Sequence, residues 1–327
     1  MSRYVIAADG GNSKTDLVVA TTDGAVLARV AGAGTRPYLD GLPPTATGLA
    51  ELARAALVTA KLPVATPVAV ASFYLANVDF ADEEAAMRDA LDAFHLADRL
   101  EIHNDTHAVL TAGSARGWGI AVVAGAGINA IGVHPDGREE RFLGIGEMSG
   151  DWGGGWAVAV AALGAAVRAV DGRGPDTALR ALVADRFGDD PESVAIAADR
   201  GQITDAELFA FAPAVFGAAL DGDAVAVGIV NRLADEVLDF VQALVRRMSV
   251  ADEDVDVVLG GGTLQSGNAA LVERIRAGVK AAAPKANLHV LDVPPVVGAL
   301  TGALTSAGAS CDAIERARAS FRGGANT

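Results

Sequence analysis

The chain has 327 residues, is 51% hydrophobic and carries a formal net charge of -15. Because this length exceeds the usual size of one domain, two domains are expected. The acidic charge argues against a nucleic-acid or anionic-membrane partner, since binding to phosphate backbones depends on clustered Lys and Arg. The expected partner is therefore a small molecule, and an anionic one would need a local turn of backbone N–H groups.

Cysteine content and hydropathy indicate a cytoplasmic protein. The single cysteine, Cys311, excludes an internal disulfide and any Cys-based zinc or four-cysteine iron–sulfur site within one chain. Residues 1–3 lead directly into a predicted strand, without the basic and apolar regions of a signal peptide. The longest apolar helical run, 156–167, is shorter than the roughly 20 residues that cross a bilayer. We therefore expect no membrane segment.

The first third of the chain is predicted to be an α/β unit that starts with an antiparallel meander. Three short strands come first, and Asp23-Gly24 forms a tight turn between the second and the third. After a loop at 32–44, helices and strands alternate, which is typical of α/β folds. The predicted strands are 5–8, 16–21, 26–31, 67–74 and 100–103, and the predicted helices are 47–61, 82–94 and 106–116.

The rest of the chain repeats this order of elements with more helical residues. Its first strand runs into a glycine turn, as the first strand of the chain does, which suggests a duplicated fold. We place the domain boundary at Gly117-Trp118-Gly119, so that 1–117, completed by the C-terminal helix 296–327, forms one lobe and 118–295 the other. The predicted strands are 120–124, 130–134, 141–143, 255–259 and 288–291, and the predicted helices are 156–170, 176–186, 205–219, 224–248, 268–283 and 296–307.

Three glycine turns follow buried strands, at 9–15, 125–129 and 260–263. Such a turn exposes backbone N–H groups and, where it lacks Cβ atoms, lets phosphate oxygens approach closely. Any one of them alone could be a simple hairpin, but three in the same setting favour phosphate binding. The chain has neither a P-loop ending in Gly-Lys-Ser/Thr nor a Gly-x-Gly-x-x-Gly motif in a strand–helix–strand unit, which argues against those nucleotide-binding folds.

Two carboxylates stand at the ends of predicted strands, Asp9 beside the first glycine turn and Asp105 before a helix. A carboxylate in such a place can serve a metal ion or a hydroxyl group. Asp105 could instead cap the helix that follows it, because Asp is a favoured N-cap residue. His103 and His107 are four residues apart, but the strand end between them argues against a shared helix face and hence against a metal site.

An ordered set of short motifs spans nearly the whole chain. The motifs are Asp9-Gly-Gly-Asn-Ser-Lys-Thr-Asp16, Asn104-Asp105, Gly125-Ala-Gly-Ile-Asn129, Gly144-Ile-Gly146, Gly150-Asp151 and Gly260-Gly-Gly-Thr263. In this order and spacing they resemble the N-acetylglucosamine kinase family. That family shares its pattern with the activating ATPases of benzoyl-CoA reductase, within the actin, hexokinase and heat-shock ATPase superfamily.

The resemblance implies an α/β fold of two actin-like (ribonuclease H-like) lobes with a nucleotide cleft between them. It further implies that Asp105 is the catalytic base and that Asp9 acts near Mg²⁺. The ATP-binding residues that it implies are Gly10, Gly11, Asn12, Ser13, Lys14, Thr15, Gly125, Ala126, Gly127, Ala218, Gly260, Gly261 and Gly262. The sugar-binding residues that it implies are Arg36, Asn129, Gly144, Ile145, Gly146 and Asp151. Two positions depart from the family pattern, because Ala126 replaces the usual Thr and Arg36 stands where an Asn usually faces the sugar.

The expected function is phosphorylation of N-acetylglucosamine at its 6-hydroxyl, by a homodimeric enzyme that uses ATP and Mg²⁺. Glucosamine and N-acetylmuramate are alternative acceptors, since Arg36 leaves the identity of the sugar open. Another alternative is a non-catalytic sugar sensor, although such proteins usually carry a helix-turn-helix module before the first phosphate strand, which here begins near residue 4. An activating ATPase for a radical enzyme would need iron–sulfur ligands that Cys311 alone cannot supply.

Overall fold

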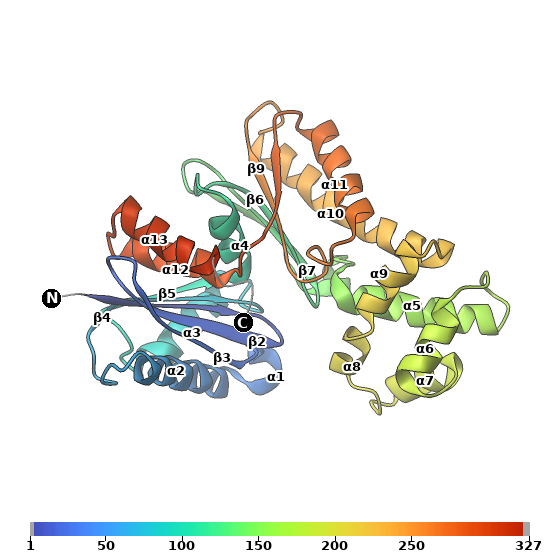
Figure 1. The fold of residues 1–327 in the computed structure, drawn as a ribbon, viewed down its shortest axis with the longest axis horizontal. Helices are drawn as coiled ribbons and strands as arrows, with labels where there is room; N and C mark the ends of the chain where they lie inside the picture. Colours follow the sequence, from blue (N-terminus) through green and yellow to red (C-terminus); the bar gives the residue numbers. More distant parts are fainter. Residues whose placement is uncertain (1–2, 323–327) are drawn as a thin grey trace. The chain divides into compact units, whose positions relative to one another are not determined.

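The computed structural model describes residues 3–322, so the last five residues of the predicted C-terminal helix lie outside the described part. The chain forms two compact units, each built around a five-stranded sheet. The first unit contains Met1–Ala121, Pro135–Arg138 and Leu291–Thr327, and the second contains Val122–His134 and Glu139–Val290. Both sheets are mixed and carry helices, as expected for an α/β fold (Figure 1).

The first sheet begins with the predicted antiparallel meander. Its strands are β1 (Tyr4–Gly10), β2 (Lys14–Thr21), β3 (Val26–Ala33), β4 (Val68–Leu75) and β5 (Arg99–Asn104). Their order in the sheet is β3-β2-β1-β4-β5, and β4 and β5 continue the sheet parallel to β1. The carboxyl ends of these three parallel strands therefore lie at one edge, where Gly10 is level with Leu75 and Leu75 with Asn104.

Alternate residues of β1 enter two different apolar cores, which explains why this strand is apolar without interruption. Ile6 and Ala8 pack in the core with α2 (Leu42–Thr59) and α3 (Ala81–Asp92), whereas Val5 and Ala7 pack in the core on the other face. That second face is covered by α4 (Asp105–Gly113), α12 (Val296–Ser306) and α13 (Cys311–Arg322) (Figure 1).

Close backbone packing holds α12 against the rest of the first unit. A Cβ atom built on Gly298 in α12 would lie 1.9 Å from the carbonyl oxygen of Ala108 in α4. At Gly302 a Cβ atom would lie 2.1 Å from the hydroxyl oxygen of Tyr74. Glycine at both positions lets α12 approach β4 and α4 more closely than a side chain would allow.

The second sheet repeats the strand order of the first. Its strands are β6 (Gly119–Ala124), β7 (Ile128–Val133), β8 (Glu139–Arg141), β9 (Asp256–Gly260) and β10 (Asn287–Val290). Their order is β10-β9-β6-β7-β8. In both sheets the first strand along the chain is central, the second and third follow it towards one edge, and the fourth and fifth follow it towards the opposite edge. As in the first sheet, strands two and three are antiparallel and strands four and five are parallel. The predicted duplication of the fold is confirmed.

The second unit has more helices than the first, and its helices differ from the prediction in two places. The helices are α5 (Gly154–Val170), α6 (Leu179–Phe187), α7 (Pro191–Asp199), α8 (Asp205–Phe209), α9 (Ala212–Leu220), α10 (Ala224–Met248) and α11 (Ala269–Ala282). The single helix predicted at 205–219 is broken into α8 and α9, because Pro213 suits the first turn of a new helix rather than a helix interior. The helix α7 was not predicted, and it is capped by Asp190, whose carboxylate accepts hydrogen bonds from the N–H groups of Glu192 and Ser193.

The predicted loop at 32–44 is partly helical. It contains the short helix α1 (Pro37–Asp40), and α2 begins at Leu42 rather than at residue 47. The prolines in this stretch favour these starts, because proline fixes a helical φ and lacks an N–H group that the first turn would leave unpaired. A one-turn 3-10 helix, η1 (Gly146–Ser149), also stands in a stretch without a predicted element.

No single helix within residues 3–322 is long and apolar enough to cross a membrane, although one pair bent by 112°, Asp205–Leu220 with Ala224–Met248, has the required length and composition.

Candidate active site

The first glycine turn joins β1 to β2 and is held tightly at its base. The N–H of Gly11 donates to the carbonyl oxygen of Lys14 at 2.9 Å, and the side chains of Asn12, Ser13 and Lys14 are exposed. The turn therefore exposes three polar side chains next to a backbone hydrogen bond that closes it. Thr15 differs from its neighbours, because it is fully buried and its hydroxyl donates to the carbonyl oxygen of Ala33 at 2.7 Å.

Asp9 and Asp105 lie at the same edge of the first sheet, at the carboxyl ends of β1 and β5. Burial raises the pKa of Asp9 to about 8, and the nearby charges of Asp105 and Asp16 add to the shift. Burial also raises the pKa of Asp105 to about 7, with a further contribution from the charge of Asp79. A carboxylate with a pKa near neutrality is well matched to accepting and releasing a proton.

Asn104, and not Asp105, caps the helix α4. The side-chain oxygen of Asn104 accepts from the N–H of Thr106 at 3.1 Å and from its hydroxyl at 2.5 Å. Its amide group donates to a carboxylate oxygen of Asp79 at 2.8 Å. Asp105 is the first residue of the helix, so the alternative that it serves as the N-cap is wrong.

The two histidines beside these carboxylates take part in an aromatic cluster. The ring of His103 lies 4.8 Å from that of Tyr74 and 5.7 Å from that of His107, measured between centroids. Residues 3–322 contain no group of three or more His, Cys, Asp or Glu side chains arranged to hold a metal ion. Mg²⁺ does not require such a group, since it is commonly bound through one or two carboxylates together with substrate phosphates and water.

The second glycine turn, between β6 and β7, packs directly against the start of α5. The carbonyl oxygens of Gly125 and Ala126 accept from the N–H groups of Gly155 and Trp156 at 2.8 and 3.0 Å. Gly154 has a φ of +71°, and a Cβ atom there would lie 2.4 Å from the carbonyl oxygen of Gly127. Only glycine fits this position without a shift of the backbone.

The third glycine turn contacts the second within the same unit. Gly261 has a φ of +90°, and a Cβ atom there would lie 2.4 Å from the carbonyl oxygen of Ala124. The N–H of Thr263 donates to that same oxygen, and its hydroxyl donates to the carbonyl oxygen of Gly125, both at 3.1 Å. The structure thus brings together two of the segments predicted to bind ATP. Ala218 is buried in α9, and its role near the adenosine stays a prediction.

The residues predicted to bind the sugar in the second unit form one connected loop. A Cβ atom on Gly144 would lie 2.6 Å from the side-chain nitrogen of Asn129. The N–H of Asp151 donates to the carbonyl oxygen of Gly146 at 3.0 Å, and the hydroxyl of Ser149 lies within hydrogen-bonding distance of two acceptors, the Asp151 carboxylate and the carbonyl oxygen of Gly146. Ile145 in this loop is about half exposed.

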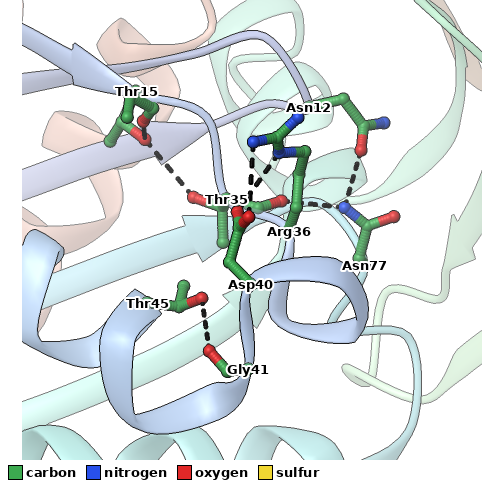
Figure 2. Close-up of polar contacts among 9 residues, drawn as sticks. Asn12, Thr15, Thr35, Arg36, Asp40, Gly41, Thr45 and Asn77 are labelled. Atoms are coloured by element: carbon green, nitrogen blue, oxygen red, sulfur yellow. Dashed lines mark hydrogen bonds and ion pairs between the residues drawn. The ribbon is translucent and has the colours of Figure 1, made fainter. Parts of the chain in front are cut away.

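Arg36 stands at the start of α1 and turns back onto its own helix. Its guanidinium forms an ion pair with the carboxylate of Asp40 at 3.2 Å, and both side chains are nearly half exposed (Figure 2). The residue before it, Thr35, is buried and lies against the first glycine turn.

The pattern of the BadF/BadG/BcrA/BcrD ATPase family matches residues 8–307 of this chain. The chain belongs to this family. The N-acetylmuramic acid/N-acetylglucosamine kinase of Clostridium acetobutylicum is 26% identical over 269 residues, which cover 81% of this chain and 87% of the relative. The N-acetyl-D-glucosamine kinase of Dictyostelium discoideum is 23% identical over 50% of this chain and 53% of its own length.

Solved structures agree with this assignment. A Chromobacterium violaceum protein described as a candidate N-acetylglucosamine kinase has 26% identity and a TM-score of 0.72, and the match covers 91% of this chain and 98% of that one. A ROK family glucokinase from Streptomyces griseus, solved with glucose and AMPPNP, has 17% identity and a TM-score of 0.55, with coverage of 98% and 100%. The second likeness shows the fold alone. The resemblance to N-acetylglucosamine kinases and the actin-like fold class are thus confirmed.

Proposed function

We propose that this protein is an ATP-dependent kinase that phosphorylates an amino sugar, N-acetylglucosamine or N-acetylmuramate. The observation that carries the proposal is the placement of Asp105 at the sheet edge beside Asp9 and the first glycine turn, with a pKa of about 7 and with Asn104 as the N-cap of α4. The names of the relatives supply the class of acceptor. Further support comes from the second unit, which contains the glycine turns at 125–129 and 260–263 and the polar loop at 144–151.

Phosphoryl transfer requires little covalent chemistry from the protein. A sugar hydroxyl oxygen attacks the γ-phosphorus of ATP, the bond to the bridging oxygen of the departing ADP breaks, and the hydroxyl proton passes to the carboxylate of Asp105. The glycine turns position the phosphates through backbone N–H groups. Ala126 has no hydroxyl, so phosphate binding at the second turn depends on the backbone alone.

Asp9 is the residue that would hold Mg²⁺. Its carboxylate shares the sheet edge with Asp105, and the raised pKa reflects burial together with this neighbouring negative charge. A cation beside such a carboxylate offsets the repulsion. When bound, Mg²⁺ neutralises charge on the phosphates during transfer.

We propose Asn129, Gly144, Ile145, Gly146 and Asp151 as sugar-binding residues. We also propose that Arg36 affects which sugar is accepted. Carboxylate and amide groups suit the hydroxyl and acetamido groups of an amino sugar. We further propose the 6-hydroxyl of N-acetylglucosamine as the acceptor atom. The cytoplasmic location and the homodimer stay predictions from the sequence.

A coupled assay for ADP release over a panel of sugars tests the proposal. We expect ATP turnover that depends on N-acetylglucosamine or N-acetylmuramate, with Mg²⁺ present and with a phosphorus NMR signal that places the phosphate on the 6-oxygen. Glucose serves as the matched sugar without the acetamido group. ADP release that is no faster with any amino sugar than without sugar would refute the kinase proposal.

A further inference from the structure

Asn77, two residues after the end of β4, has a backbone conformation that few residues other than glycine adopt. Its φ is +59°, in the left-handed region, where Asn is among the best tolerated side chains. The side-chain amide donates to the side-chain oxygen of Asn12 at 2.7 Å and to the carbonyl oxygen of Thr35 at 2.8 Å (Figure 2). One amide group therefore joins the first glycine turn to the loop that leads into α1.

The contact with Thr35 determines which way both amide groups point. A backbone carbonyl oxygen can only accept, so the atom of Asn77 that faces it must be the NH₂ group. The same NH₂ group then donates to the side-chain oxygen of Asn12. The NH₂ group of Asn12 is consequently directed away from Asn77 (Figure 2), and this residue is exposed. An oriented hydrogen-bond donor stands in the turn that we propose binds phosphate.

The turn and the loop pack so closely that neither Gly10 nor Gly34 has room for a side chain. A Cβ atom on Gly34 would lie 2.0 Å from the carbonyl oxygen of Asn12, and one on Gly10 would lie 2.3 Å from the hydroxyl oxygen of Thr35. The N–H of Thr35 also donates to the carbonyl oxygen of Gly11 at 2.9 Å. A displacement of the turn therefore displaces the loop as well.

We propose that Asn77 is a positioning residue that couples occupation of the first phosphate turn to the conformation of residues 34–41. A phosphate oxygen that accepts from the NH₂ group of Asn12 holds the side-chain oxygen of Asn12 towards Asn77. The amide of Asn77 also donates to the carbonyl oxygen of Thr35, the residue before Arg36, and so fixes the start of the loop. The inference rests on the proposed function, since it takes a nucleotide phosphate as the ligand of the turn.

Two substitutions remove the two hydrogen bonds in different ways. Asn77→Gly keeps the left-handed backbone without strain and deletes the amide. Asn77→Asp keeps the size of the side chain but sets a carboxylate oxygen against two acceptors. Lys61→Gly is the matched control, because Lys61 has a φ of +60° at the end of α2 and lies outside this network.

Amide hydrogen exchange of residues 34–41, with and without a non-hydrolysable ATP analogue and Mg²⁺, tests the coupling. In the parent and in Lys61→Gly we expect the analogue to slow exchange by about tenfold, within the range of ordinary coupling free energies. In both Asn77 variants the analogue should slow amide exchange of residues 34–41 by less than about twofold. Exchange in the first glycine turn should still be slowed by the bound analogue. A merely structural role would raise exchange equally with and without the analogue.

Two results would overturn the inference. One is that the ATP analogue slows amide exchange of residues 34–41 equally in Asn77→Gly and in the parent. The other is that the analogue does not slow this exchange in the parent. Sugar phosphorylation, measured on the same preparations, separates this failure from that of the proposed function. A parent that phosphorylates an amino sugar but shows no Asn77-dependent slowing refutes this inference alone. A parent that shows the slowing but phosphorylates no sugar refutes the proposed function.

Discussion

At the scale of single residues, the raised pKa of Asp105 gives the reaction a defined pH dependence. The group accepts a proton only when it is ionised, and its pKa is about 7. At saturating Mg²⁺, which would keep Asp9 ionised, we expect kcat/KM for the sugar to rise about tenfold for each pH unit up to about pH 7 and to level off above it, because the ionised fraction of Asp105 rises in this way.

Asp79→Asn tests whether the charge of Asp79 contributes to this pKa. Asn at this position can still accept the hydrogen bond from Asn104 but carries no charge. Removal of the negative charge lowers the pKa of Asp105, so the midpoint of the profile should move to lower pH. A profile that is flat between about pH 5 and about pH 8 in the parent would contradict Asp105 as the base.

Arg36 gives a second prediction, about the choice of acceptor. A guanidinium pairs strongly with a carboxylate, and N-acetylmuramate carries one that N-acetylglucosamine lacks. Arg36→Asn should therefore shift the ratio of kcat/KM towards N-acetylglucosamine. Its effect on stability should be about 1 kcal/mol or less, since the ion pair with Asp40 is nearly half exposed. An unchanged ratio across the sugar panel would place Arg36 outside the acceptor site.

At the scale of elements, the sequence predicted the segments whose signal is local. The apolar run of β1 and the glycine turn after it are visible in eleven consecutive residues, Val5 to Thr15, and both are present in the structure. Asn77 and Asp79 were missed because their partners are distant in the sequence, 65 residues from Asn77 to Asn12 and 25 from Asp79 to Asn104. The alternative that Asp105 caps α4 was wrong, because two adjacent residues both favour N-caps and Asn104 takes this role.

The contact between α5 and the second glycine turn predicts the effect of a substitution at Gly154. Gly154→Ala would place a Cβ atom 2.4 Å from the carbonyl oxygen of Gly127, at a φ of +71°. We expect a loss of about 1–3 kcal/mol in unfolding free energy, or a displaced turn with weaker ATP binding. Thermal unfolding and nucleotide titration measure the two effects.

Gly164→Ala in the same helix is the matched control. Gly164 is exposed in the interior of α5, and a Cβ atom there meets nothing within 4 Å. Alanine should stabilise the helix at this position by about 0.5–1 kcal/mol. Equal behaviour of the two variants would mean that Gly154 does not support the turn.

At the scale of the whole molecule, two sheets with the same strand order carry different parts of the proposed chemistry. The first unit holds Asp9, Asp105 and the turn that Asn77 braces, and the second holds two glycine turns and the loop of Asp151. The repeated strand order was accessible from the sequence, because both halves begin with an apolar strand, a glycine turn and a second strand. The more numerous helices of the second unit were harder to delimit, since breaks such as the one before Pro213 interrupt a continuous apolar pattern.

The most direct test of the account is the phosphorylation rate of Asp105→Asn with the sugar that the parent prefers. A positioned general base contributes about 10²- to 10⁴-fold in rate. We therefore expect kcat to fall by about two orders of magnitude or more, while melting temperature and ATP affinity stay close to those of the parent because Asn104 still caps α4. A folded Asp105→Asn protein that phosphorylates the sugar at close to the parent rate would contradict the account.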